Sequence, residues 1–98
     1  RSLAAFHELG DMRSVAESLE MSASLEVSAK RFERAARLAG SAARLREEMG
    51  FPKPAAESQA FASDLESGRM ELGAREWDAC ETEGRAAALQ QAVRWALE

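Results

Sequence analysis

The segment Phe32–Gly50 constrains the fold of this chain most strongly, because its helical pattern is apolar on two sides. The residues of one stripe are Phe32, Ala35, Ala36, Ala39 and Ala43, and those of the neighbouring stripe are Leu38, Ala42, Leu45 and Met49. A helix with two apolar faces needs a cover on each of them. Many of these side chains are small, which lets neighbouring backbones approach closely. The pattern therefore predicts a helix inside an array of helices, not one lying on a sheet.

Gly40 lies in the middle of this helix, and Gly50 lies at its end. A mid-helix glycine costs about 1 kcal/mol relative to alanine, so we expect a neighbouring helix to pack closely against Gly40. Gly50 is followed by Pro52, which is typical of a helix end. Opposite charges four residues apart support the helix, and the two pairs are Glu33 with Arg37 and Arg44 with Glu48.

Helical periodicity recurs along the rest of the chain, and no segment alternates with the period of a strand. The expected helices cover residues 2–9, 11–27, 32–49 and 54–72, a short segment between Gly73 and Gly84, and residues 89–97. The second helix is expected to bury Met12, Val15, Ala16, Leu19 and Ala23, and the fourth Phe61, Ala62, Leu65 and Leu72. Gly68 weakens the fourth helix and allows a kink or an early end there.

The order of these helices predicts an all-α fold of stacked antiparallel helical hairpins. We expect a tetratricopeptide-like right-handed solenoid of about six helices with a C-terminal helical cap. Residues 1–98 would form one helical-repeat module, with tetratricopeptide-like helices in 1–50, a proline-containing corner at 51–54 and capping helices in 55–98. Only one complete repeat is visible, and a single repeat cannot bury its own faces. We therefore expect the module to be a fragment of a larger protein.

Composition and charge exclude several function classes. The net charge is −4, and the 13 Lys and Arg residues are interleaved with 17 Asp and Glu residues, so no basic surface for nucleic acid is expected. The single cysteine, Cys80, cannot form a disulfide within the chain, which fits a reducing compartment. The sequence has neither a membrane span nor a secretion signal. We therefore expect a cytoplasmic protein without a membrane partner.

The segment Ser14–Phe32 looks like a helix-turn-helix at first sight. Such a motif needs a turn former about four residues after a buried alanine, and an apolar residue about six positions further on. Counted from Ala16, these positions hold Glu20 and Glu26. Carboxylates at the turn and at a core position argue against DNA binding, so we expect no direct nucleic acid contact from this segment.

No set of residues points to catalysis, to a cofactor or to a metal. His7 is the only histidine, and no second histidine or cysteine lies at ligand spacing from it. Cys80 has no histidine in its segment and is expected to act as a small buried hydrophobic residue. The glycines occur singly, so none of them forms a phosphate-binding loop. We expect no catalytic, cofactor-binding or metal-binding residue and no enzymatic activity of this chain.

The stretch ERAARLAGSAARLREEMGFPKP, over residues 33–54, resembles the segment that closes the tetratricopeptide-like helical region of large bacterial transcriptional regulators. These are multidomain ATPases with LuxR-type or related output domains. The segment LAAFHELGDMRSVAESLE upstream is similar to the preceding repeat, and EWDACETEGRAAALQQAVRWALE downstream is similar to the closing helix pair. The resemblance rests on short motifs such as ELGD, ERAARL, LRE and EGR.

The resemblance also places a turn at the motif Glu83-Gly84-Arg85, between the last two helices. There we expect Gly84 to act as a left-handed helix cap and Arg85 to pair with a nearby carboxylate. The chain departs from the family pattern at two positions. Glu81 stands where the family often has a large aromatic residue, and Gly68 stands where it often has leucine.

Three hypotheses follow for the function. The first is a non-catalytic protein–protein interaction module of a larger bacterial transcriptional regulator with an ATPase domain, whose partner is its own upstream repeats, another copy or another protein. The second is an effector- or peptide-binding sensor domain of a signalling protein, and the third, with least support, is a small helical enzyme. The candidate interaction surface consists of residues at the upstream edge or off the main core stripes: Phe6, Leu9, Met21, Leu25 and Trp95.

Overall fold

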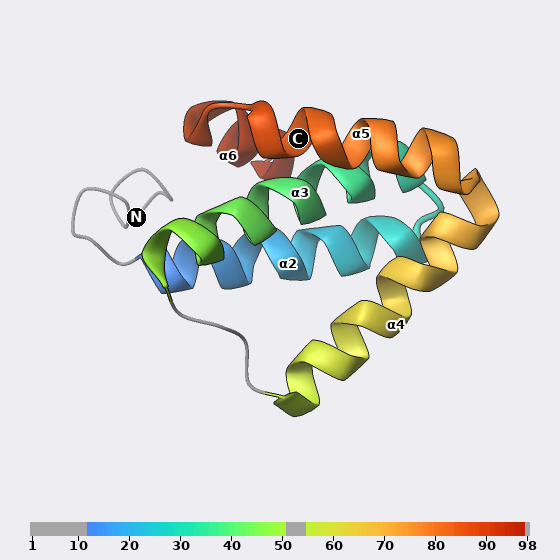
Figure 1. The fold of residues 1–98 in the computed structure, drawn as a ribbon, viewed down its shortest axis with the longest axis horizontal. Coiled ribbons are helices and arrows are strands. Elements are labelled where there is room, and N and C mark those ends of the chain that lie inside the picture. The colour runs from blue at the N-terminus through green and yellow to red at the C-terminus, as the bar shows by residue number, and fades with distance from the viewer. Residues whose placement is uncertain (1–11, 51–54, 98) are drawn as a thin grey trace.

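A computed structural model of the protein describes residues 12–50 and 55–97, and this part of the chain contains five helices and no strand. The helices are α2 (Met12–Ser28), α3 (Phe32–Met49), α4 (Ala55–Leu72), α5 (Ala74–Ala86) and α6 (Leu89–Leu97) (Figure 1). The prediction of an all-α fold is confirmed for the described residues, although the helix count there is five and not about six. The helix expected over residues 2–9 and the corner at 51–54 lie outside them.

The helices α2 and α3 form an antiparallel hairpin, which carries most of the core (Figure 1). The connection is short and places Lys30 in the left-handed region, with a φ of 64°. The apolar stripes of α2 and α3 face one another and form the main core cluster. Its buried members are Val15, Ala16, Leu19, Ala23, Leu38, Ala39, Ala42 and Leu45, joined by Ala92 of α6. The predicted inward residues of α2 are thus confirmed, except that Met12 is only partly buried.

The helix α5 covers the second apolar side of α3. Trp77 of α5 packs with Ala35 and Ala36 of α3 in a second buried cluster. Further along the contact, Gly40 and Gly84 bring the two backbones together. A methyl group added at Gly40 would overlap the carbonyl oxygen of Glu81. The prediction that a neighbouring helix packs closely against Gly40 is therefore confirmed, and α3 is covered on both sides.

The role expected for Gly84 is wrong. The helix α5 continues through Gly84 to Ala86, so this glycine is not a left-handed cap. A side chain there would overlap the backbone of Arg37, and the carbonyl oxygen of Gly84 accepts a hydrogen bond of 2.8 Å from the Ser41 hydroxyl. Glycine is thus required at this position for close helix packing.

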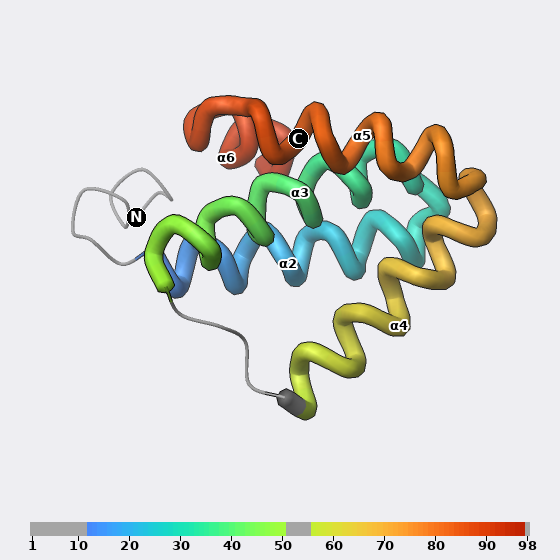
Figure 2. The backbone as a smooth tube through the Cα atoms, viewed as in Figure 1, coloured from blue at the N-terminus to red at the C-terminus, as the bar shows by residue number. Residues whose placement is uncertain are grey.

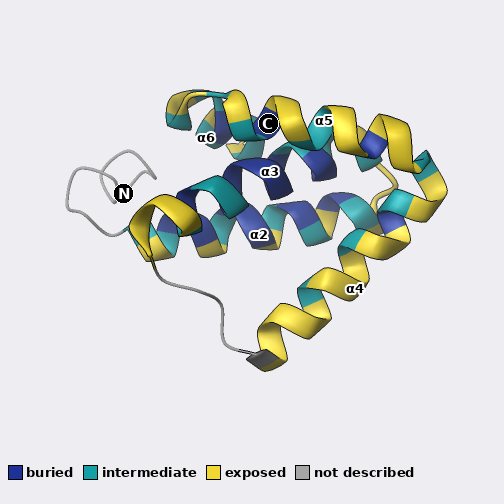
Figure 3. Ribbon diagram, viewed as in Figure 1, coloured by how far each residue is buried: buried dark blue, intermediate teal, exposed yellow. Residues whose placement is uncertain are grey.

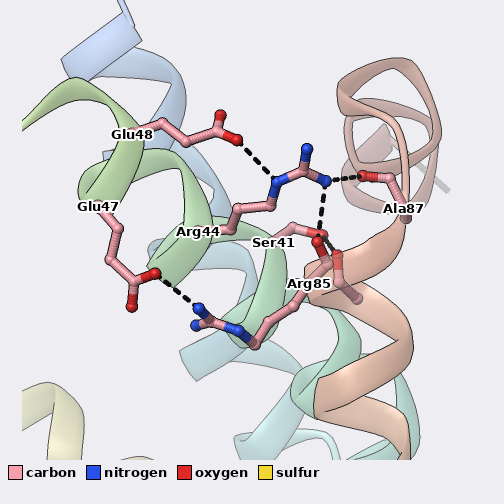
Figure 4. Close-up of polar contacts among 7 residues, drawn as sticks. Ser41, Arg44, Glu47, Glu48, Arg85 and Ala87 are labelled. Atoms are coloured by element: carbon pink, nitrogen blue, oxygen red, sulfur yellow. Dashed lines mark hydrogen bonds and ion pairs between the residues drawn. The ribbon is translucent and has the colours of Figure 1, made fainter.

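The end of α5 is capped by a side chain from α3. The Arg44 guanidinium donates hydrogen bonds to the carbonyl oxygens of Arg85 and Ala87, at 2.9 and 3.3 Å, which satisfies carbonyls that have no partner within a helix end (Figure 4). Arg44 also pairs with Glu48, as expected, and Arg85 pairs with Glu47 at 2.6 Å. The predicted pairing of Arg85 with a carboxylate is confirmed.

The helix α4 diverges from the α2–α3 pair and is mostly exposed (Figures 2 and 3). It does not end early at Gly68, because it continues to Leu72. The buried Gly68 lies against the Trp77 ring, and a methyl group there would come within 2.8 Å of it. Phe61, Leu65 and Leu72 are only partly buried, and Ala62 is exposed, contrary to the burial predicted for it.

Candidate interaction surface

Two residues of the predicted interaction surface lie together on the outer side of α2. Met21 and Leu25 are 67% and 63% exposed, and they lie one helical turn apart. Large apolar side chains this exposed on one helix face are available for contact with a partner. Phe6 and Leu9, which we also predicted for this surface, lie outside the described residues.

Trp95, the fifth predicted residue, is half-buried on α6 and packs against the main core cluster. Its carbonyl oxygen accepts a hydrogen bond of 2.7 Å from the Arg34 guanidinium. The Arg37 guanidinium lies 6.0 Å from the centre of its ring, at the outer limit of a cation–π contact. These contacts tie Trp95 to α3, whereas Met21 and Leu25 point to the outside of α2.

Beside Met21, a groove of about 510 Å³ lies between α2 and the N-terminal half of α4. Each helix contributes four residues, and each set has the spacing i, i+3, i+4 and i+7 that defines one helix face. The lining residues are Glu17, Glu20, Met21 and Ser24 from α2, and Glu57, Ala60, Phe61 and Asp64 from α4. The predicted interaction surface contains only Met21 of these eight residues, and Phe61 is predicted from the sequence as a buried residue.

The groove is acidic. Four of its eight lining residues are Glu or Asp, and none is Lys or Arg. Glu20 is buried and forms a two-pronged ion pair with Arg46 of α3, with N–O distances of 2.5 and 3.0 Å. This hydrogen bond raises the pKa of Arg46, and the charges of Glu20, Glu17 and Glu57 act in the same direction.

A second buried carboxylate lies nearer the C-terminal end of α2. Glu26 accepts hydrogen bonds from the guanidinium groups of Arg34, at 2.7 Å, and Arg31, at 3.1 Å. Burial raises the pKa of this carboxyl, but the hydrogen bonds and charges of the two arginines outweigh it and hold the pKa below its ordinary value. Glu26 and Glu20 are the positions that the helix-turn-helix comparison singled out, and both lie within the continuous helix α2.

The described residues offer little for metal or thiol chemistry. No group of three His, Cys, Asp or Glu residues in this part of the chain could hold a metal ion. Burial raises the pKa of the half-buried Cys80 thiol, which disfavours the reactive thiolate. Two smaller hollows exist, one of about 280 Å³ between the ends of α2 and α3 and helix α6, and one of about 200 Å³ between α4 and α5.

The sequence does not predict the α4 wall of the groove, because only one buried face is expected for residues 54–72. The spacing of Glu57, Ala60, Phe61 and Asp64 marks a second face of the same helix, and that spacing was visible in the sequence. The sequence does not show which helix lies opposite this face. The direction of α4 depends on contacts near its C-terminal end, where Gly68 meets Trp77.

Comparison of the chain with known protein families, with curated proteins and with solved structures finds no match. Of the helices in residues 12–50 and 55–97, none is both long enough and apolar enough to cross a membrane.

Proposed function

We propose that this chain is a non-catalytic helical module that acts by protein–protein contact. The observation that carries the proposal is the exposed pair Met21 and Leu25, which lies on the outer side of α2 next to the groove. Burying a side chain of this size in an interface contributes about 1.5–3 kcal/mol. A pair one turn apart is the arrangement by which a helix face recognises a partner.

The arrangement of the helices supports a repeat module. The ion pair of Arg37 with Glu83 and that of Glu47 with Arg85 run in the same order along both helices, so α3 and α5 run in the same direction. The helix α2 lines a groove together with α4, which is the first helix of the next pair, α4 and α5. Helices that alternate in this way belong to stacked hairpins, and we propose a tetratricopeptide-like stack on this basis.

The parent that we propose is a larger bacterial transcriptional regulator with an ATPase domain and a LuxR-type or related output domain, located in the cytoplasm. This part of the proposal rests on the resemblance of the motifs ERAARL, LRE and EGR. An immunoblot of the source cells with an antibody to this chain tests it. A band many times heavier than the 10.7 kDa of this chain is expected, and a band near 11 kDa would contradict it.

The contact surface is tested by the double variant Met21→Glu/Leu25→Glu. The matched control is Met70→Glu/Leu97→Glu, because these two residues are 76% and 71% exposed and lie on other helices. Self-association is measured by analytical ultracentrifugation and docking by pull-down with the separately expressed upstream part of the parent. We expect the first variant to weaken association and the control to leave it unchanged. Equal association of the wild-type protein and both variants would contradict the proposal.

The alternative is a peptide-binding sensor, and the groove of about 510 Å³ is the observation that favours it. Its two walls are helix faces, which suit a peptide better than a small effector enclosed on all sides. A thermal shift against a panel of metabolites distinguishes the small-effector case, because only a specific ligand raises the melting temperature by several degrees.

A further inference from the structure

We propose that the groove between α2 and α4 binds a basic amphipathic helix of a partner protein. This inference rests on the proposed interaction function and names the chemistry of the partner. It follows from three properties of the groove, which are its length, the apolar side chain on each wall and its charge.

The length of the groove fits a helix. Both walls extend over the spacing i to i+7, which is about 10 Å or two helical turns. The two helix faces line one groove of about 510 Å³. A third helix placed between them would contact both walls through its own i, i+3, i+4 and i+7 residues.

Each wall of the groove carries one large apolar side chain at a matching position. Met21 occupies position i+4 of the α2 wall, and Phe61 occupies position i+4 of the α4 wall. Phe61 also packs against the core cluster, which fixes its position, whereas Met21 is largely exposed. A methionine can adapt its shape to an incoming side chain. One or two apolar anchors of a partner helix would fit between these two residues.

The charge of the groove selects the partner. Glu17, Glu57 and Asp64 line it and form no ion pair with any residue in the part of the chain that the structure describes, while Glu20 is held by Arg46. Lysine or arginine beside the apolar anchors would complement these three carboxylates. A second copy would place its own acidic α2–α4 face against this one, so the charges argue for a different, basic partner.

The test uses two synthetic peptides of about 18 residues, a length at which an isolated helix becomes stable enough to probe. Both carry leucines at i, i+4 and i+7, and they differ only in having lysine and arginine or glutamate at the flanking positions. Binding is measured by fluorescence anisotropy with the full chain. We expect the basic peptide alone to bind, and its affinity to fall as salt is raised because exposed charges are screened.

A triple variant assigns this binding to the groove. Neutralising the lining carboxylates should weaken binding of the basic peptide by about tenfold or more. A control variant with the same change in net charge removes carboxylates outside the groove and should bind as the wild type does. Circular dichroism verifies that both remain folded. The substitutions are Glu17→Gln, Glu57→Gln and Asp64→Asn in the groove, and Glu33→Gln, Glu71→Gln and Glu76→Gln in the control.

Each other outcome overturns the inference. These outcomes are no binding of the basic peptide, equal binding of the acidic peptide, and equal weakening by both triple variants, which would indicate a general charge effect. Loss of self-association in the groove variant would assign the groove to a second copy instead. If the peptide fails but Met21→Glu/Leu25→Glu still weakens association, the interaction function stands and only the basic helix is wrong.

Discussion

The two apolar faces of the α2–α3 hairpin meet their neighbours in opposite ways. On the α3 side, Gly40 and Gly84 let α5 approach until backbone touches backbone. On the α2 side, carboxylates line the space toward α4, and an open groove of about 510 Å³ remains. The same hairpin thus packs closely along α5, whereas α4 contacts it through partly buried side chains such as Phe61 and Leu65 and leaves a groove beside them.

This difference teaches which residues decide how closely two helices pack. Small residues remove the side-chain layer between helices, so contact becomes close and tolerates little change. Charged residues keep their hydration unless an opposite charge meets them, as Arg46 meets Glu20. Glu17 and Glu57 form no such ion pair, because Arg46 binds Glu20 and reaches them only through longer-range charge, so a groove is expected there instead of a packed contact.

The largest effect should come from breaking the close contact. A methyl group at Gly84 overlaps the backbone of Arg37, which cannot rotate away, so Gly84→Ala should lower the free energy of unfolding by about 3 kcal/mol. The comparison variant is Gly68→Ala, because its methyl group would meet side chains and not a backbone, the Trp77 ring at 2.8 Å and Val27 at 3.3 Å, so its loss should be smaller. Urea denaturation of both variants measures the difference. Equal losses would mean that the glycine contact is not special.

The next effect concerns the charged contact on α2. Glu20→Ala removes the carboxylate that pairs with the partly buried Arg46, and breaking a fully buried pair usually costs about 3–5 kcal/mol. Glu17 and Glu57 remain near Arg46, so we expect a smaller loss of about 2 kcal/mol. The exposed pair Arg44–Glu48 provides the control, because Glu48→Ala should cost no more than about 0.5 kcal/mol. A loss from Glu20→Ala no larger than that of the control would contradict the role of this pair.

The sequence predicted the close contact from one side only. The cost of Gly40 in a helix indicated that another backbone lies against it, and this was correct. The prediction for its partner Gly84 is a helix cap. In the sequence, a glycine that caps a helix and a glycine that allows close packing near a helix end look the same. Only the pairing of α3 with α5, whose hydrogen bonds join residues 38 to 46 positions apart in the sequence, distinguishes the two roles.

The buried carboxylates show a second limit of the sequence. Glu20 and Glu26 interrupt the apolar pattern of α2, which correctly argued against a helix-turn-helix. Their burial could not be predicted, because it depends on Arg34 and Arg46, which lie on the antiparallel helix α3. Likewise, Arg44 pairs with Glu48 as local spacing predicts, whereas Arg37 forms its ion pair with the distant Glu83. Local charge spacing is informative only where no carboxylate from another helix competes for the same cation.

Acid should separate the two kinds of contact. The pKa of Glu26 is lowered in the folded state, so its pairing stabilises the protein above the ordinary glutamate pKa, and this stabilisation is lost as the pH falls through the folded-state value. We expect Glu26→Gln to cost about 1 kcal/mol at pH 7 and to approach the wild-type stability below about pH 4. The cost of Gly84→Ala should not change with pH, because no charge takes part. Thermal unfolding from pH 7 to pH 3 measures both, and a Glu26→Gln cost that stays constant would contradict the pairing.

The smallest effect is expected at Glu81, between α4 and α5. Burial raises the pKa of this carboxyl, and the charge of Asp78 adds to the effect, so the charged form is disfavoured in the folded state. A raised carboxyl pKa destabilises the protein at neutral pH, and this cost disappears as the pH falls through the folded-state pKa. Glu81→Gln should therefore stabilise the protein by up to about 0.5 kcal/mol at pH 7 and by less at pH 4. Glu83→Gln is the control, since Glu83 pairs with Arg37 at 3.0 Å and its loss should not stabilise. If Glu81→Gln destabilises instead, the carboxylate contributes to the α4–α5 contact, and α4 is held by charge and not by its few apolar residues.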